Sequence, residues 1–399
     1  MDNESFKPTR WTFLFLMLAS AMIFMGAAAV APALPLISKG FPDASEATIS
    51  LIITLPALAI ALTGFFMGVL SDKIGRIPVL VASLAIFSLA GSSAFYLSSL
   101  PEILVGRFIL GIGIAGITCS TTALIIDYYH GETRMRVLGY QAAAMGVGVL
   151  LLETSGGYLA GISWHTAFLI YLIGFIILAG VLFTMKEPVR YIVKVEPGTP
   201  DETFPLAGII LVYATQFFGA LLFFIMPIKF PYLMANLDAA RILSENTALA
   251  SGIFLGFLGC LISLAGLFFW RVAERFHRYT ILTVSFIFFG IGLCGLGFST
   301  SLVTVGISIF FIGIGDGLLV PTITNWIATI TPKQFVGRAM GGYSIALNLG
   351  IFVSTLAIVP VTAIVATNNN LFIAFGCAAF VLTLPYLFVV VKRRFAPGS

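Results

Sequence analysis

Long apolar stretches make up most of this chain, and short polar connections separate them. A helix needs about 20 apolar residues to cross the hydrocarbon core of a bilayer, and each stretch reaches that length. A membrane β-barrel would instead use strands of about 10 residues that alternate in polarity, which these stretches do not. The pattern predicts an all-α integral membrane protein with twelve transmembrane helices, at residues 12–37, 46–71, 78–97, 101–127, 136–161, 164–186, 205–234, 246–270, 279–298, 301–330, 336–365 and 371–391.

The composition indicates a chain that is surrounded by a lipid bilayer. Hydrophobic residues make up 59% of it and charged residues 10%, whereas a soluble domain carries roughly 25% charged residues. The first apolar stretch is too long for a cleaved signal peptide and has no convincing small-residue cleavage site. We therefore expect it to be the first transmembrane helix.

The second half of the chain repeats the first at a constant offset of 202 residues. A charged hairpin at residues 65–79 returns in degraded form at residues 270–278. The matched pairs are Asp72/Glu274, Lys73/Arg275, Arg76/Arg278, Gly111/Gly313, Gly113/Gly315, Arg136/Arg338, Gly139/Gly341 and Gly148/Gly350. Such an offset predicts two parallel repeats, each a six-helix bundle, at residues 1–186 and 205–399. A polar cytoplasmic linker at residues 187–204 joins them.

The distribution of basic residues predicts the orientation. If both termini are cytoplasmic, 17 of the 21 Lys and Arg residues lie in cytoplasmic segments, as the positive-inside rule requires. The net charge of +4 follows from this bias, so it does not indicate a nucleic-acid partner. The expected location is the plasma membrane.

The residues offer no chemistry for an enzyme. No Gly-x-x-x-x-Gly-Lys-Ser/Thr run is present, so the chain has no P-loop for ATP. No nucleophile with a base and no His-Glu-x-x-His cluster occurs, and the four cysteines lie within predicted helices without metal-ligand spacing. We expect neither a cofactor nor a metal, and the energy for transport would come from a gradient.

Three ionisable residues lie within predicted spans, where a charge costs about 2.5–3.5 kcal/mol and is functional by default. With a rise of 1.5 Å per residue, Arg107 and Glu153 lie about 9 and 10 Å deep on consecutive helices. We expect them to form a hydrogen-bonded pair, which is either structural or allows Glu153 to take up a proton when it separates. Asp316 lies about 22 Å deep, and it either serves proton coupling or cation recognition or makes a neutral interhelical hydrogen bond.

Other candidates carry weaker signals. Lys229 lies between Pro227 and Pro231 near the outer boundary, where its amine can reach water, and it is a candidate for substrate contact or an outer gate. Aromatic and Met side chains are more often packing or lipid-facing than cavity-lining. The candidates for cavity lining are Phe24, Met25, Phe217, Phe218 and Phe224.

Several motifs resemble the major facilitator superfamily, and more narrowly its drug:proton antiporter branch. Gly68-Val-Leu-Ser-Asp72-Lys73-Ile-Gly75-Arg76 is similar to the superfamily's signature between helices 2 and 3, and Arg107-Phe-Ile-Leu-Gly111-Ile-Gly113 resembles its helix 4 motif. The helix 5 antiporter motif is represented by Gly139, Gly148, Gly156 and Gly157, with Leu152-Glu153 where the motif has Gly-Pro.

The resemblance implies a cytoplasmic gate at the charged hairpin. The Asp72 carboxylate would meet the positive N-terminus of helix 11, near Gly337 and Gly341, with Arg76 between Asp72 and Asp127. These contacts would close the cytoplasmic side in the outward-facing state. The predicted gate residues are Gly68, Asp72, Lys73, Gly75, Arg76, Asp127, Gly337, Arg338 and Gly341.

The preferred function is export of a small amphiphilic or cationic compound by proton antiport, with two bundles that rock about a central site. The alternative is a proton-coupled exporter or importer of a polar metabolite such as a sugar, an amino-acid-like compound or a metallophore. In that alternative the central charges bind substrate instead of protons. A single chain contains the whole pathway, so we expect a monomer.

Overall fold

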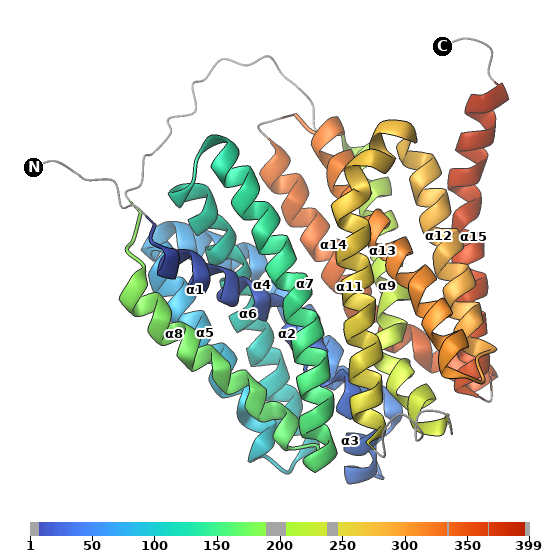
Figure 1. Ribbon diagram of the computed structural model, residues 1–399, viewed down its shortest axis with the longest axis horizontal. Coiled ribbons are helices and arrows are strands. Elements are labelled where there is room, and N and C mark those ends of the chain that lie inside the picture. The colour runs from blue at the N-terminus through green and yellow to red at the C-terminus, as the bar shows by residue number, and fades with distance from the viewer. Residues whose placement is uncertain (1–7, 189–204, 238–245, 333–334, 366, 396–399) are drawn as a thin grey trace, which may run out of the picture.

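The computed structural model of the protein describes residues 8–188, 205–237, 246–332, 335–365 and 367–395, and their regular elements are all helical. Twelve helices in this part of the chain are long and apolar enough to cross a membrane. They form two groups that lie side by side, with α7 and α11 next to each other in the centre (Figure 1). The predicted all-α membrane fold is confirmed. Most of the predicted linker, 187–204, lies outside the described residues.

The first repeat contributes six spans. They are a segmented first span, made of α1 (Arg10–Ala21), η1 (Met22–Phe24), α2 (Met25–Ala28), η2 (Ala31–Ala33) and α3 (Leu34–Gly40), then α4 (Glu46–Ile74), α5 with η3 (Arg76–Ser92, Ser93–Phe95), α6 (Leu100–Tyr128), α7 (Gly131–Ile162) and η4 with α8 (Thr166–Leu172, Ile173–Thr184). The second repeat contributes α9 (Leu206–Asn236), α11 (Thr247–Arg275), α12 (Arg278–Gly297), α13 (Leu302–Ile330), α14 (Val336–Ile364) and α15 (Asn368–Phe395).

The predicted first span at residues 12–37 corresponds to one apolar span, Arg10–Gly40. Within it, 3₁₀ turns at Met22–Phe24 and Ala31–Ala33 interrupt the α-helix. Pro32 and Pro35 have no backbone N–H and cannot donate to the carbonyl four residues earlier, which favours a break at this point. Val30 N–H accordingly donates to the Ala27 carbonyl, three residues back, at 3.2 Å. The break leaves backbone acceptors in the middle of the span that need other partners.

The two repeats meet tightly at one end of the molecule, which we call the Glu46 end because α4 begins there. On α7, a Cβ atom at Gly157 would lie 2.5 Å from the Ala248 carbonyl oxygen of α11. Thr54 of α4 and Thr355 of α14 share a hydrogen bond of 2.8 Å between their hydroxyls. These contacts close this end.

The opposite end, where α4 ends at Ile74, is open between the repeats, and we call it the Asp72 end. A Cβ atom added at Gly139 of α7, at Gly68 of α4 or at Gly341 of α14 would meet nothing within 4 Å in the described part of the chain. Figure 1 shows α7 and α11 diverging toward the end at which the termini lie. The structure is therefore closed at the Glu46 end and open at the Asp72 end.

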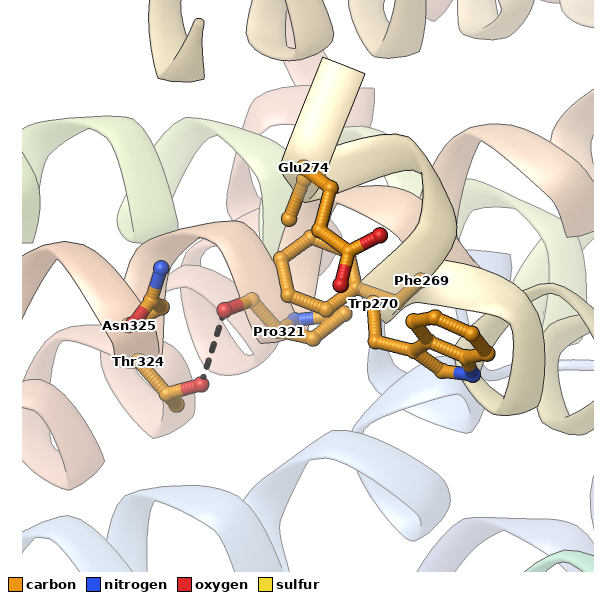
Figure 2. A pocket seen from close by; sticks show the side chains of 7 residues that line it. Phe269, Trp270, Glu274, Pro321, Thr324 and Asn325 are labelled. Carbon is orange, nitrogen blue, oxygen red and sulfur yellow. Dashed lines mark hydrogen bonds between the residues drawn. The ribbon is translucent and has the colours of Figure 1, made fainter. Parts of the chain in front are cut away.

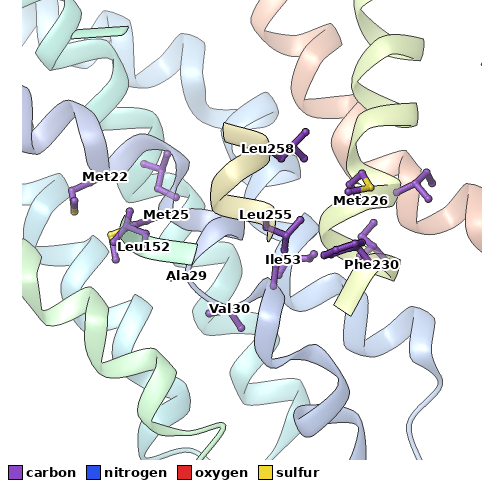
Figure 3. Packing of buried hydrophobic residues seen from close by; sticks show 14 of the residues in the cluster. Met22, Met25, Ala29, Val30, Ile53, Leu152, Met226, Phe230, Leu255 and Leu258 are labelled. Carbon is purple, nitrogen blue, oxygen red and sulfur yellow. The ribbon is translucent and has the colours of Figure 1, made fainter. Parts of the chain in front are cut away.

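One continuous hydrophobic core joins the two repeats. It includes Met25, Ile53 and Leu152 from the first repeat and Phe230 and Leu255 from the second, and Figure 3 shows them at the level where the bundles meet. Because the broken first span lies in this core, its free carbonyls are shielded from water.

Candidate functional site

Arg107 of α6 is completely buried and holds several helices together. Its Nε donates to the Ile52 carbonyl at 2.6 Å, its Nη1 donates to the Tyr171 hydroxyl at 2.9 Å, and its Nη2 donates to the Gly26 carbonyl. The Tyr171 hydroxyl in turn donates to the Met25 carbonyl at 2.8 Å. The guanidinium thus links α4, α6, η4 and the break in the first span.

The backbone explains why Arg107 is needed there. Pro56 lies within α4 and has no N–H, so the Ile52 carbonyl four residues earlier loses its helical partner. In the first span, Val30 donates to the Ala27 carbonyl instead of the Gly26 carbonyl. A buried carbonyl without a partner costs about 1–3 kcal/mol, and one planar guanidinium reaches both.

The predicted hydrogen-bonded pair between Arg107 and Glu153 is wrong for this conformation. Glu153 of α7 is only 5% exposed, and its Oε2 has no hydrogen-bond partner among the described residues. Arg107 uses its donors on backbone carbonyls and on Tyr171 instead. The Tyr171 hydroxyl is bound to Arg107 and to the Met25 carbonyl.

Glu153 lies where the two repeats touch. A Cβ atom at Gly252 of α11 would lie 2.2 Å from the Glu153 carbonyl oxygen, so the backbones of α7 and α11 are in direct contact at this level. Any separation of α7 from α11 would change the surroundings of the carboxyl group. Glu153 is thus a buried acid at the contact that must open if the Glu46 end opens.

Asp316 of α13 is the second acid inside the membrane-spanning region. Glycines on either side pack closely, because a Cβ at Gly315 would lie 3.0 Å from the Ser285 carbonyl oxygen and one at Gly317 would lie 2.5 Å from the Ile262 carbonyl oxygen. No hydrogen bond or ion pair of Asp316 is found within the described ranges. Asp316 is therefore an unpaired acid in the second repeat.

The charged hairpin forms a compact ion cluster at the Asp72 end. The Arg76 guanidinium contacts the Asp72 carboxylate, and its Nε lies 3.2 Å from Asp127 Oδ2. The Arg76 and Ile77 backbone N–H groups donate to the Glu187 carboxylate at 2.7 and 2.9 Å. Glu187 thus caps the N-terminus of α5, where a negative charge is favoured.

Gly75 is required at the bend between α4 and α5. Its φ is +126°, and a Cβ there would lie 2.9 Å from Pro78 and 3.1 Å from Glu187. Glycine is the residue that accepts this backbone conformation without steric cost. Lys73 beside it is exposed.

The start of α14, where the resemblance places the partner of Asp72, has two glycines that face open space in this conformation. A Cβ at Gly337 or Gly341 of α14 would meet no described atom within 4 Å, and Arg338 lies with its guanidinium carbon 5.7 Å from the centre of the Phe335 ring. Because the prediction concerns the state in which this end is closed, the gate stays a prediction.

Lys229 of α9 is paired across the two repeats at the closed end. Its Nζ lies 2.5 Å from Glu46 Oε2 and 5.5 Å from the centre of the Tyr232 ring. Lys229 is 2% exposed, so its amine is buried instead of reaching water, whereas the Glu46 side chain is 49% exposed. A cavity of about 460 Å³ lies beside the pair between the ends of α4 and α14.

The predicted cavity-lining side chains have different environments. Met25 is completely buried in the core, and so it does not line an accessible cavity in this conformation. Phe24 and Phe218 are exposed, at 47% and 41%. Phe217 and Phe224 are partly buried, and Phe217 packs edge-on against Phe218 with ring centres 5.3 Å apart.

The helix 5 glycines bring α7 close to two neighbours. Gly148 faces Ala21 at the end of α1, where a Cβ would lie 2.9 Å from the Ala21 Cβ, and Gly156 faces Ala29 in the break. Gly157 faces the start of α11. Gly148 and Gly156 therefore pack on the first span, whereas Gly157 contacts the second repeat.

A second cavity, of about 560 Å³, lies at the Asp72 end between α11 and α13 (Figure 2). Phe269, Trp270 and Glu274 line it from α11, and Pro321 and Asn325 line it from α13. Trp270 is 54% exposed. This cavity combines aromatic rings with a carboxylate.

His277, between α11 and α12, has a lowered pKa. Burial is the main cause, and the positive charges of Arg393 and Arg278 add to it. The His277 Nε2 lies 2.7 Å from Arg393 Nη1, and because a guanidinium can only donate, this nitrogen accepts the hydrogen bond. The contact therefore holds the imidazole neutral.

The sequence reasoning missed Glu46, Glu187 and Tyr171. Each is a polar residue next to or within a span, and its partner lies far away in sequence, so no local pattern reveals the contact. The available signal for Tyr171 and Arg107 was Pro56, since a proline inside a predicted helix marks a carbonyl that needs a donor.

Comparison with known proteins agrees with this architecture. Residues 16–270 and 211–398 match the family described as Major Facilitator Superfamily. A multi-drug resistance efflux pump PmrA homolog of Lactococcus lactis subsp. lactis strain IL1403 is 26% identical over 82% of each chain. The class C tetracycline resistance protein of Escherichia coli is 27% identical over 91% of this chain and 93% of its own. The solved xylose transporter XylE from E. coli, in an inward open conformation, has a TM-score of 0.75 at 15% identity and covers 94% of this chain and 95% of its own.

Proposed function

Since the chain belongs to the Major Facilitator Superfamily, a family of membrane transporters, we propose that it exports a small amphiphilic or cationic compound in exchange for protons. The relatives named as a multi-drug efflux pump and a tetracycline resistance protein support export of such a compound. The transported molecule and protons are the proposed partners, and a single chain is the proposed functional unit.

The observation that carries the proposal is the pair of acids, Glu153 and Asp316, that have no counter-charge within the described residues. A carboxyl group in the membrane can hold a proton or a cation, and it cannot hold both. Competition for one carboxylate therefore couples the release of a cation to the uptake of a proton, which is the definition of antiport.

The two ends of the molecule support alternating access. We place the Asp72 end in the cytoplasm with both termini, because the basic residues gather on that side, and the Glu46 end outside the plasma membrane. The conformation described above then faces inward and receives substrate from the cytoplasm. Opening of the Glu46 end would expose the acids to external protons, which displace the cation.

The gate at the Asp72 end completes the cycle. The cluster of Asp72, Arg76 and Asp127 would reach the start of α14 at Gly337 and Gly341 when this end closes, because the helix N-terminus attracts the carboxylate. Arg107 acts in this scheme as the fixed support of the broken first span, next to Tyr171 and Glu153.

The test uses reconstituted vesicles with an internal pH indicator. Addition of a lipophilic cation should cause proton movement in the native protein, and the Glu153→Gln, Asp316→Asn double variant should still move substrate downhill without proton movement. Glu102→Gln is a matched control, because Glu102 is an exposed acid in the first turn of α6. Proton-dependent transport that persists in the double variant would defeat the proposal. Proton flux with neutral polar metabolites alone would favour the alternative of a metabolite transporter.

A further inference from the structure

We infer that the cavity between α11 and α13 at the Asp72 end is a binding site for a hydrophobic ammonium, at which the transported compound is first captured. The inference rests on the proposed function, since it identifies the substrate as a cation with at least one N–H donor and an apolar body. The residues that define the site are Phe269, Trp270, Ala273, Glu274, Pro321, Thr324 and Asn325.

The side chains of this cavity are apolar on one side and rich in hydrogen-bond acceptors on the other. Phe269, Trp270 and Pro321 offer flat apolar surfaces, and Figure 2 shows the Glu274 carboxylate among the side chains that line the cavity. The Thr324 hydroxyl donates to the Pro321 carbonyl at 3.1 Å, so its lone pairs remain available as acceptors. Glu274 makes no ion pair within the described ranges, which leaves its charge available to a ligand.

Trp270 and Glu274 lie on the face of α11 that points toward the first repeat. Toward the Glu46 end, Gly252, Gly256 and Ser263 face α7, with a distance of 2.0 Å from Ser263 Oγ to a Cβ built at Gly146. At 3.6 residues per turn this face continues through Trp270 and Glu274. At their level α7 has moved away, because Gly139 of α7 has open space. The site is thus accessible from the open gap.

On α13 the site lies close in sequence to Asp316. Pro321 follows Asp316 by five residues, which is about 7.5 Å along the helix axis. The same ligand chemistry, a cation that a carboxylate attracts, applies at both points.

Arg271 is the neighbouring charge that opposes the ligand. Its guanidinium carbon lies 4.9 Å from the centre of the Trp270 ring and 5.2 Å from that of Phe268. This stacking demonstrates that the indole accepts a cation on its face. It also places a positive charge next to the cavity, so Arg271→Gln should strengthen ammonium binding.

The correspondence between the two repeats explains why the site would be available only when the Asp72 end is open. Glu274 matches Asp72 at the offset of 202 residues, and Asp72 is the residue proposed to meet the start of α14. By the same symmetry, closure would bring Glu274 to the start of α7, near Arg136. Arg136 would then replace the ammonium as the partner of Glu274. The compound would leave the site toward the centre of the protein as the gate closes.

The test is binding of dansylcadaverine, a fluorescent primary ammonium, to the purified full chain, with its N-acetyl derivative as the neutral comparison. Glu274→Gln should weaken the binding of dansylcadaverine about fivefold, the upper range for one exposed charge, and leave the acetylated compound unchanged. Trp270→Leu should weaken dansylcadaverine binding about threefold through loss of the ring contact. Glu102→Gln and Trp11→Leu are controls, since both replace exposed residues away from the cavity.

The outcomes separate this inference from the proposed function. Equal affinity for the two compounds, or unchanged affinity in Glu274→Gln, overturns the inference even if proton-driven transport is intact. Binding needs no gradient, so Glu274-dependent binding together with absence of proton-coupled transport would support the site and refute the antiport. Thermal melting of each variant establishes that it is folded.

Discussion

The Lys229 Nζ and Glu46 Oε2 atoms lie 2.5 Å apart and join the second repeat to the first at the closed end. The two residues are 183 positions apart in sequence, and their helices, α9 and α4, belong to different bundles. Lys229 is buried while Glu46 is half exposed. When the Glu46 end opens, the helices separate and the lysine amine must find another partner or water. The ion pair therefore favours the closed state.

We predict that Glu46→Gln shifts the protein toward the state that is open at the Glu46 end. Removal of one partner leaves the Lys229 amine buried and unpaired, and for a partly exposed pair we expect a cost of about 2 kcal/mol. In a cysteine-free background, a cysteine at buried Ser50 beside the pair should react with a water-soluble maleimide several times faster in Glu46→Gln. Lys39→Gln, which removes an exposed charge from the end of α3, is the control. Equal labelling rates in the background protein, Glu46→Gln and Lys39→Gln would show that the ion pair does not stabilise the closed state.

We predict that Glu153→Gln keeps or slightly raises the thermal stability of the protein. Glu153 has a buried oxygen without a partner, and an amide is cheaper to bury than a charge. Arg107→Lys should instead lower the stability strongly, because an ammonium cannot reach the carbonyls of both Ile52 and Gly26. Melting curves in detergent measure both effects. If Glu153→Gln lowered the melting temperature as much as Arg107→Lys, the prediction would be wrong. That result would support the ion pair between Arg107 and Glu153 that was predicted from the sequence.

The contrast between these two residues explains what can be read from the sequence. The twelve spans were predictable because length and apolarity are local properties. The partners of Arg107 were not, because they are backbone carbonyls, and any residue type can supply a carbonyl. Equal depth placed Arg107 and Glu153 at one level, but depth does not determine which face of a helix a side chain occupies. The Arg107 side chain points to the break in the first span instead.

The same reasoning applies to Lys229. Lys229 lies near the end of α9, and its burial was not predicted, because a boundary lysine ordinarily reaches water. Only the packing of α4 against α14, and of α14 against α9, brings Glu46 to the amine. The glycines of the helix 5 motif were identified from the sequence. Their close contacts with Ala21 and Ala29 could be identified only from the three-dimensional structure.

We predict that His277 has a pKa below the ordinary 6.5 and that Arg393→Gln raises it only in part. Burial is the larger cause of the lowered pKa and remains in the variant, whereas one positive charge is removed. Because the unfolded chain binds this proton more readily, His277 should make the folded state less stable as the pH falls through 6.5 toward the lowered value, and have no effect above about 7. The chain has three histidines, so NMR titration resolves them. Lys392→Gln is the control, and an unchanged His277 pKa in Arg393→Gln would contradict the prediction.

Two glycines on the facing helices should respond to alanine in opposite ways. Gly252→Ala places a Cβ 2.2 Å from the Glu153 carbonyl oxygen, and such overpacking costs about 1–3 kcal/mol. Gly139→Ala meets no described atom within 4 Å in this conformation, and it gains up to about 1 kcal/mol of helix propensity. Gly252→Ala should therefore disfavour closure at the Glu46 end, and Gly139→Ala should preserve it and hinder closure at the Asp72 end. Transport rates should fall in both variants, while double electron–electron resonance between spin labels on α7 and α11 should show a wider Glu46 end only in Gly252→Ala. Identical distance distributions in the two variants would mean that this contact does not control the transition.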